Sequence, residues 1–403
     1  MEIDHSQLLE LSKKYDTPLY VYDADQILSQ ISNLKSFFPI PEFHIHFAIK
    51  ALTNRNILSI INRAGCGLDT VSIEEMQIAL SSGVEASDIN FTPSGAEREE
   101  YVFAIEHGIG LHVDNLDMLE FIAQKKPGAE VILRFNPAIR AGAHHQLQVG
   151  DEDSKFGLND PEMHEIKMQV ARHGIKVVGV HIHVGSDIST VDKYFEAFEF
   201  LLRRAADFSE HLRYINFGGG FKVAYKPGDQ TTDMQALGQK VTERFNAFKS
   251  QHHLPLQLIM EPGKFLVGKC GTFLTRVTTV KHFRKRSIVY VNSGFNHLIR
   301  PMYYGAYHRI ENISKPDATE KPYDVVGYLC ETDTFASNRN VGQIEPADIL
   351  AFHNAGAYCY MMASNYNSRV RPAEVLIHAG KDYLIRRREV LDDILRTEVM
   401  ADL

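Results

Sequence analysis

Short β-rich runs alternate with helical stretches between about residues 44 and 265, and this alternation constrains the fold more than any other feature. Between the runs, apolar residues recur at three- and four-residue spacing and a glycine often follows, which is typical of amphipathic helices. About eight such units in about 220 residues predict a (β/α)8, TIM-like barrel, with a doubly wound sheet as the alternative. The expected strands are HIHFAI (44–49), GLDTVS (67–72), INFTP (89–93), GLHVDN (110–115), VILRFNP (131–137), VVGVHIHV (177–184), LRYINF (212–217) and LQLIME (256–261).

The pattern changes after about residue 272. Runs such as FLTRVTTVKHF, RSIVYVN and YDVVGYLCET are strand-like and have no long helix between them, which predicts a second, β-rich domain of the β-barrel or sandwich type. The run PLYVYDADQI precedes the first barrel strand and is expected to pair with this second domain. The predicted limits are 1–24 for the N-terminal segment, 25–272 for the barrel and 273–403 for the β domain.

The charge balance of the 403 residues argues against two classes of partner. There are 43 Lys and Arg against 51 Asp and Glu, a net charge of −8, so we expect neither nucleic acid nor an anionic membrane as a partner. No apolar run approaches the ~20 residues that cross a bilayer, and the polar N-terminus lacks the apolar core of a signal peptide. The four cysteines are far apart with no CxxC pair, which argues against disulfides or structural zinc and favours a cytoplasmic location.

Reactive residues follow many of the predicted strands. They are Lys50, Asp69, Arg134, Asn136, His181, His183, the glycines Gly218, Gly219 and Gly220, and Glu261. Because the active site of a barrel lies at the carboxyl ends of its strands, these residues predict a site on that rim. The glycines allow close backbone approach to a phosphate, which barrels often bind after their last two strands, and Ser186 could add a hydroxyl donor. A tight turn is the alternative interpretation of the glycines.

Lys50 ends an apolar strand, and a lysine in a partly desolvated pocket becomes an amine nucleophile that can form a Schiff base. Together with a phosphate site on the same rim, it predicts pyridoxal 5′-phosphate, an aldehyde cofactor that carries a phosphate. This cofactor needs a carboxylate at its ring nitrogen, and Glu261 at the end of the eighth strand could supply it. The alternatives are a solvated lysine and a capping or salt-bridged glutamate.

Two HxH pairs, His44 with His46 and His181 with His183, each place both histidines on one face of a strand. Such pairs also occur in metal-dependent hydrolases. We expect no metal, because the first pair falls at the start of its strand and a metal site would leave Lys50 and the glycines without a role. His183 is expected to pack flat on the cofactor ring, and His181 to be a core histidine.

The second domain offers further candidates. Cys330 and Glu331 place a thiol beside a carboxylate, which makes Cys330 a candidate proton donor, whereas free cysteines are more often buried and inert. Arg300 could clamp a carboxylate with two hydrogen bonds, with an exposed surface arginine as the alternative.

Seven segments together resemble the diaminopimelate decarboxylases, a family of fold-type III pyridoxal-phosphate-dependent decarboxylases. They are FAIK, HIHVGSDI, FGGGF, EPGK, LIRPMYYGAYH, CET and GAYCYMMASNYNSRVRPAEVL, in a resemblance that runs from about residue 17 to 395. The stretch from ASNYNSR to RPAEVL is the most specific part. Ornithine and arginine decarboxylases share the lysine, glycine and EPG motifs but usually not this stretch.

The resemblance implies decarboxylation of meso-2,6-diaminopimelate to L-lysine and CO2, the last step of lysine biosynthesis by the diaminopimelate route. It implies that Lys50 carries the cofactor and that Cys330 protonates the carbon that has lost CO2. The other implied cofactor contacts are Asp69, His183, Ser186, Gly218, Gly219, Gly220, Glu261, Pro262, Gly263, Lys264 and Tyr358, and the implied substrate contacts are Lys264, Arg300, Tyr304, Glu331 and Tyr358. A homodimer is also implied, in which the Cys–Glu loop of each chain enters the barrel of the other.

Two positions depart from the family pattern. The family usually has arginine after EPG, where this chain has Lys264, a point charge in place of a planar fork. The familiar CESGD reads CETDT here, with Cys330 and Glu331 retained.

Substrate choice follows from charge. meso-Diaminopimelate ends in an ammonium and a carboxylate, and Glu331 with Arg300 supplies both opposite charges, whereas ornithine or lysine needs only an acidic pocket. The rival hypotheses are another decarboxylase of the same fold, an alanine-racemase-like enzyme, a metal-dependent hydrolase and a catalytically silent homologue that binds a partner protein.

Overall fold

The computed structural model describes residues 3–139, 154–284 and 286–403, which divide into two compact units. One unit holds the residues up to Ile27, the segment Tyr225–Gly228 and Val267–Leu403, and the other holds Leu28–Ala224 and Asp229–Leu266. The limits predicted from the sequence, at residues 24 and 272, placed the short segment Tyr225–Gly228 in the barrel, whereas in the structure it belongs to the other unit.

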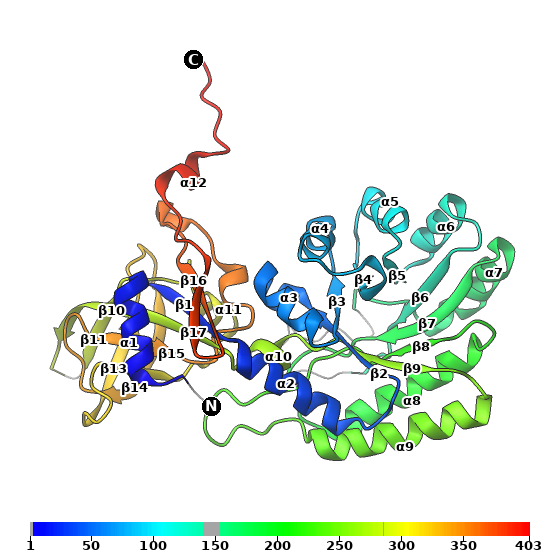
Figure 1. Ribbon diagram of the computed structural model, residues 1–403, viewed down its shortest axis with the longest axis horizontal. Helices are drawn as coiled ribbons and strands as arrows, with labels where there is room; N and C mark the ends of the chain where they lie inside the picture. The colour runs from blue at the N-terminus through cyan, green and yellow to red at the C-terminus, as the bar shows by residue number, and fades with distance from the viewer. Residues whose placement is uncertain (1–2, 140–153, 285) are drawn as a thin grey trace. The chain divides into compact units, whose positions relative to one another are not determined.

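In the unit that holds Leu28–Ala224 and Asp229–Leu266, eight parallel strands close into a barrel, which confirms the predicted fold class (Figure 1). Pairing of the first strand with the last closes the ring, with Phe43 beside Leu258. Each strand overlaps one of the runs predicted from the sequence. The strands are β2 (Phe43–Ala48), β3 (Gly67–Thr70), β4 (Ile89–Phe91), β5 (Gly110–Val113), β6 (Glu130–Phe135), β7 (Lys176–Ile182), β8 (Tyr214–Asn216) and β9 (Gln257–Met260).

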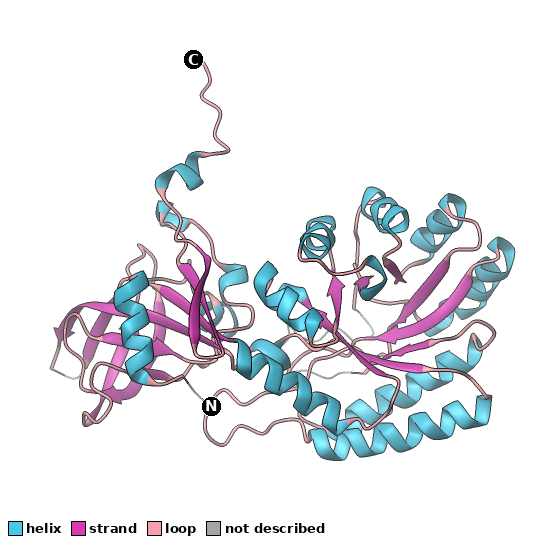
Figure 2. Ribbon diagram, in the orientation of Figure 1, coloured by secondary structure: helices cyan, strands magenta, loops and turns pink. Residues whose placement is uncertain are grey.

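Helices cover the outside of these strands (Figure 2). Several begin at a polar side chain that accepts a backbone N–H, as Ser72 does from Glu75 N at 3.2 Å, and several end at a glycine with left-handed φ, such as Gly108 and Gly174. The helices are α2 (Ala24–Phe37), α3 (Arg55–Arg63), α4 (Ile73–Ser81), α5 (Arg98–His107), α6 (Leu116–Lys125), α7 (Met163–His173), α8 (Val191–Asp207), α9 (Met234–His252) and α10 (Lys264–Val267), with 3-10 turns η1 (Ile49–Ala51), η2 (Ala86–Asp88) and η4 (Asp160–Glu162).

The other unit is built on a nine-stranded sheet, so the predicted β-rich second domain is also confirmed. Strand β1, from the N-terminal run, pairs antiparallel with β10 and parallel with β16. The strands are β1 (Leu19–Asp23), β10 (Gly271–His282), β11 (Ser287–Val291), β12 (Ile310–Asn312), β13 (Glu320–Val326), β14 (Thr334–Gly342), β15 (Ile349–Phe352), β16 (Ala373–His378) and β17 (Lys381–Arg386). The helices are α1 (His5–Tyr15), α11 (Arg300–Tyr304) and α12 (Leu391–Leu395), with 3-10 turns η5 (Tyr360–Met362) and η6 (Tyr366–Ser368).

Helix α1 packs on this sheet through its apolar face. Leu8 and Leu11 are buried against Leu19, Leu274 and Val375, and each such side chain stabilises the fold by roughly 1.5–3 kcal/mol. Within the described ranges, no helix is both long and apolar enough to cross a membrane.

Glu311 of β12 makes the stability of this unit depend on pH. Its Oε2 atom lies 2.7 Å from His353 Nε2, and Arg309 Nη1 donates to its Oε1 atom at 2.7 Å. The hydrogen bond to His353 is the main cause that lowers the pKa of Glu311 from 4.5 to about 2, against the opposing effect of burial. Because the folded-state pKa is depressed, the carboxylate stabilises the fold above pH 4.5, and this stabilisation is lost as the pH falls from 4.5 to 2.

We therefore expect Glu311→Gln to lower the melting temperature at neutral pH and to reduce its fall between pH 5 and 3. Calorimetry on the full chain measures both effects. The control is Glu345→Gln, which removes a more exposed carboxylate of the same unit from its ion pair with Lys315 and should change the melting temperature little, because exposed ion pairs contribute little to stability. An unchanged pH profile in the Glu311 variant would contradict the prediction.

Candidate active site

Three loops at the carboxyl ends of β7, β8 and β9 pack backbone against backbone. A Cβ atom on Gly219 would lie 2.3 Å from the Glu261 carbonyl oxygen, and one on Gly220 would lie 1.9 Å from the Gly185 carbonyl oxygen. Gly220 also has φ +95°, which L side chains rarely adopt. The FGGGF segment is thus a close-packed cradle, with Ser186 in the neighbouring loop. Close packing without side chains suits a phosphate, and phosphate binding stays a prediction.

Glu261 lies buried at the end of β9 and is held by side chains from the two preceding strands. Asn216 Nδ2 donates to its Oε1 atom at 2.6 Å, and His181 Nε2 lies 3.1 Å from its Oε2 atom. Burial opposes ionisation, but His181 and the Asn216 hydrogen bond hold the pKa of Glu261 well below its usual range. Burial also lowers the pKa of His181, so at neutral pH this pair carries one net negative charge.

Asp69 of β3 differs from Glu261 in the direction of its pKa shift. It is buried, its Oδ1 atom has no hydrogen-bond partner among the described residues, and burial together with the charge of Glu261 raises its pKa well above the usual range. The Lys50 ammonium opposes this rise without cancelling it. Of the two carboxyl groups, Glu261 is therefore the one that ionises more readily.

Lys50 lies in η1, immediately after β2, and is exposed. Its charge acts on the pKa values of Asp69 and His183, which places it at their end of the barrel. His183 accepts a hydrogen bond at Nδ1 from Gly219 N at 3.3 Å. Burial, followed by the charge of Lys50, lowers the pKa of His183 to about 3, so the ring is neutral and its orientation is fixed by the cradle.

The group of residues that could hold a metal ion includes one histidine of the two HxH pairs, His181. His44 is exposed, while His46 Nδ1 lies 3.0 Å from Asn90 Nδ2. Within the described chain, the group that could hold an ion is His112, His181 and Glu261, whose ligand atoms lie within 4.8 Å of one another. His181 is buried as expected of a core histidine, but its contact with Glu261 ties it to the site. His112 was not singled out, because one histidine in a strand is no signal by itself.

Lys264, the residue that departs from the family pattern, forms an ion pair with Asp187. Pro262, Gly263 and Lys264 follow Glu261 directly in the sequence, and all three are buried. Lys264 was predicted from the sequence, whereas Asp187 was not, although it lies in the HIHVGSDI segment directly after Ser186.

Cys330 and Glu331 lie in the β-rich unit and are exposed. Cys330 Sγ donates to Glu331 Oε2 at 3.3 Å, and Tyr366 OH donates to Glu331 Oε1. Asn367 Nδ2 donates to Cys330 Sγ at 3.3 Å. The thiol and the carboxylate therefore share partners from the ASNYNSR segment, a role that the sequence analysis did not assign to Tyr366.

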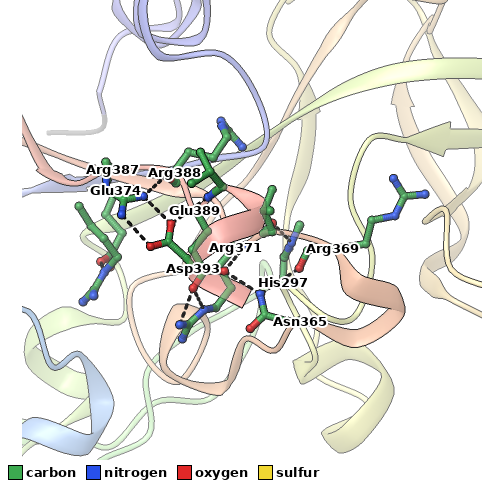
Figure 3. Close-up of polar contacts among 12 residues, drawn as sticks. His297, Asn365, Arg369, Arg371, Glu374, Arg387, Arg388, Glu389 and Asp393 are labelled. Carbon is green, nitrogen blue, oxygen red and sulfur yellow. Dashed lines mark hydrogen bonds and ion pairs between the residues drawn. The ribbon is translucent and has the colours of Figure 1, made fainter. Parts of the chain in front are cut away.

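The ASNYNSR–RPAEVL stretch is anchored by Glu389 (Figure 3). Asn365 Nδ2 donates to Glu389 Oε2 at 2.6 Å, and Arg371 donates to Glu389 through its backbone N at 2.8 Å and its Nε at 2.6 Å. These bonds fix both sides of the turn that carries Tyr366, so the partners of Cys330 and Glu331 sit on a braced segment.

Arg300 of α11 is buried, which rules out the alternative that it is an exposed surface arginine. Its Nη1 atom donates to Tyr225 OH at 2.8 Å, and its guanidinium lies 4.9 Å from the centre of the Tyr225 ring. Among the described atoms, Arg300 Nε has no hydrogen-bond partner, so a donor remains for a ligand carboxylate. Tyr304 ends α11, and Tyr358 lies before η5 with φ +57°.

The predicted residues divide between the two units. The barrel set is Lys50, Asp69, His183, Ser186, Gly218, Gly219, Gly220, Glu261, Pro262, Gly263 and Lys264, and the set of the β-rich unit is Arg300, Tyr304, Cys330, Glu331 and Tyr358. In the barrel set the structure adds Asn216, which precedes the cradle at the end of β8 and was not predicted.

Known proteins resemble this chain over nearly its full length. The family model for the pyridoxal binding domain of pyridoxal-dependent decarboxylases matches residues 24–268. Diaminopimelate decarboxylase of Methanothermobacter thermautotrophicus is 36% identical over 98% of this chain and 94% of that protein. The chain belongs to the diaminopimelate decarboxylase family. The Escherichia coli K12 member is 33% identical over 99% of this chain and 98% of its own.

Solved structures of the family have the same fold. The Helicobacter pylori diaminopimelate decarboxylase complexed with L-lysine has a TM-score of 0.89 and 32% identity, and covers 96% of this chain and 98% of its own. The chain is thus a pyridoxal-phosphate-dependent decarboxylase of the diaminopimelate decarboxylase type.

The barrel residues fit pyridoxal phosphate. Glu261 is an ionised, buried carboxylate whose contacts among the described side chains are Asn216 and a histidine of lowered pKa, so a protonated ring nitrogen would supply a countercharge. The glycine cradle suits the phosphate, His183 offers a neutral ring of fixed orientation, and Lys50 offers an amine.

Gly220→Ala tests the cradle. The added Cβ would meet the Gly185 carbonyl at 1.9 Å at a φ of +95°, so we expect a loss of about 3 kcal/mol or more in unfolding free energy, with weakened pyridoxal phosphate binding. Chemical denaturation and cofactor titration measure the two effects.

Gly174→Ala is the matched control. Its φ of +61° is also left-handed, but nothing lies within 4 Å of an added Cβ. It should cost only about 1 kcal/mol and leave cofactor affinity unchanged. Equal effects of the two variants would argue against a close-packed cradle.

Proposed function

We propose that this chain decarboxylates meso-2,6-diaminopimelate to L-lysine and CO2, the last step of lysine biosynthesis by the diaminopimelate route. The observation that carries the proposal is the buried, ionised Glu261 beside the glycine cradle, at the end of the barrel that holds Lys50. The named activity of the relatives, which match this chain over nearly its full length, supports the same substrate.

Bound pyridoxal phosphate supplies an electron sink for the electron pair that remains when CO2 leaves. Lys50 provides the amine that attaches to the cofactor aldehyde, and Glu261 keeps its negative charge where the ring nitrogen is expected. His183, neutral and oriented by its hydrogen bond from Gly219 N, would pack against the ring of the bound cofactor. Cys330 donates its thiol proton to the carbon that has lost CO2.

The selectivity for meso-diaminopimelate rests on two charges. Arg300 is buried and retains a donor at Nε that suits the distal carboxylate, and Glu331 is ionised and suits the distal ammonium. Tyr304, Tyr358 and Lys264 complete the proposed substrate contacts. An enzyme that acts on ornithine or lysine has no carboxylate to place there, and a buried arginine would repel the distal amine.

We also propose that two copies of the chain form a homodimer with shared sites. The exposure of Cys330, Glu331 and Tyr366 supports this arrangement, because a partner chain can reach them. We further propose a cytoplasmic location, since Cys66, Cys270, Cys330 and Cys359 are all free thiols.

Lys50→Ala tests the chemistry. We expect loss of the cofactor's visible absorbance and of nearly all CO2 release from meso-diaminopimelate, because no amine remains at that position to attach the aldehyde. Lys240→Ala, which removes an exposed lysine paired with Asp192 on the barrel, should leave both unchanged. Retained turnover in the Lys50 variant would refute the assignment.

The same assay decides between the remaining rivals. The wild-type enzyme should release CO2 from meso-diaminopimelate and not from L-ornithine, L-arginine or L-lysine. Release from ornithine or arginine would keep the fold and the chemistry but overturn the roles of Arg300 and Glu331. Stoichiometric zinc by elemental analysis, with no cofactor bound, would instead favour a metal site at His112, His181 and Glu261.

Mixed subunits test the shared site. Lys50→Ala and Cys330→Ala chains, each nearly inactive alone, should regain up to about a quarter of wild-type activity when unfolded and refolded together, because one of the two sites in a mixed dimer is then intact. Refolding each variant by itself is the control. No gain above the single variants would show that each site is built within one chain.

A further inference from the structure

Asp187 and Lys264 form a largely buried ion pair beside the glycine cradle. Asp187 Oδ1 accepts from Lys264 Nζ, with exposed side-chain fractions of 19% and 9%. Asp187 follows Ser186 in the loop after β7, and Lys264 follows Gly263 and begins α10 after β9. The pair therefore links the segments that follow β7 and β9, whereas the Gly218–Gly220 cradle follows β8, the strand between them.

The backbone holds Asp187 firmly at this point. Its φ of +61° is uncommon for a residue with a side chain, and such a conformation persists where its surroundings impose it. The next residue is tied down twice: Ile188 N donates to Gly220 O at 3.3 Å, and Thr232 Oγ1 donates to Ile188 O at 2.6 Å. The carboxylate of Asp187 is thus a fixed charge and not a mobile surface group.

The ion pair lowers the net positive charge that an anionic ligand meets at Lys264. A lysine ammonium carries one positive charge and three donors, of which Asp187 engages one and offsets the charge. An oxyanion that approaches Lys264, whether a phosphate or a carboxylate, therefore also meets a fixed negative charge nearby. An arginine at this position would present a planar fork with further donors.

We propose that Asp187 is a positioning residue that directs the Lys264 ammonium and, as its built-in countercharge, sets how tightly the site binds an oxyanion. The inference deepens the proposed function, on which it rests for the identity of the oxyanion: the cofactor phosphate or the substrate carboxylate. Asp187 contributes both a hydrogen-bond acceptor and a negative charge, and these two contributions can be separated.

Asp187→Asn removes the charge and keeps a side-chain oxygen as acceptor. We expect it to tighten oxyanion binding by roughly three- to tenfold, because repulsion between like charges is removed. Asp187→Ala removes the acceptor as well, so its gain should be smaller. Asp192→Asn is the control, because it removes an exposed carboxylate paired with Lys240 on the same unit and changes the net charge equally.

Three titrations on the full chain measure the effect: inorganic phosphate by the rise in melting temperature of the cofactor-free protein, pyridoxal phosphate by absorbance, and KM for meso-diaminopimelate with the cofactor saturating. Tighter phosphate and cofactor binding in Asp187→Asn shows that Lys264 faces the cofactor phosphate. A lower KM with unchanged cofactor affinity shows that it faces the substrate carboxylate. A gain in affinity is also not what a merely damaged fold would give.

Affinities that are unchanged or weaker in all three titrations would overturn the inference. A wild-type protein that binds no pyridoxal phosphate and releases no CO2 would overturn the proposed function instead, and the phosphate titration would still decide the role of Asp187. In a Lys264→Arg background the gain from Asp187→Asn should shrink, because a guanidinium can donate to Asp187 and to the ligand at once.

Discussion

Closure of eight parallel strands into one ring is the constraint on which the rest of the barrel unit depends. Because β2 to β9 all run in one direction, their carboxyl ends share one rim, and the residues that follow them meet there whatever their distance along the chain. Strand register then decides the contacts. His181 lies opposite Asn216 across β7 and β8, and both side chains reach Glu261 at the end of β9.

The interior of the rim is organised around a single negative charge. The pKa of Glu261 is lowered and that of Asp69 is raised, because two carboxylates in one buried region cannot both bear charge at low cost. The same burial keeps His183 neutral. The barrel thus presents an anion, a neutral ring and the Lys50 amine, which is the set of groups that pyridoxal phosphate requires.

The β-rich unit contributes reactive groups in a different way. Cys330 and Glu331 are exposed, and their order comes from hydrogen bonds to Tyr366 and Asn367 rather than from burial. Glu389 in turn braces the segment that carries those two residues. Exposure of this kind leaves the thiol and the carboxylate accessible to a partner chain, whereas Arg300 is buried and held by Tyr225.

The sequence by itself determined the barrel, its eight strands, the β-rich second domain and the rim on which Lys50, His183 and Glu261 lie. It could do so because hydrophobic period and element spacing are local properties, and because parallel strands always end at a common edge. Only the tertiary structure decided which side chains touch: Asn216 and His181 with Glu261, Asp187 with Lys264, and Tyr366 with Glu331. These contacts join residues 35 to 80 positions apart, since they depend on strand register and on the paths of loops, neither of which a local pattern encodes.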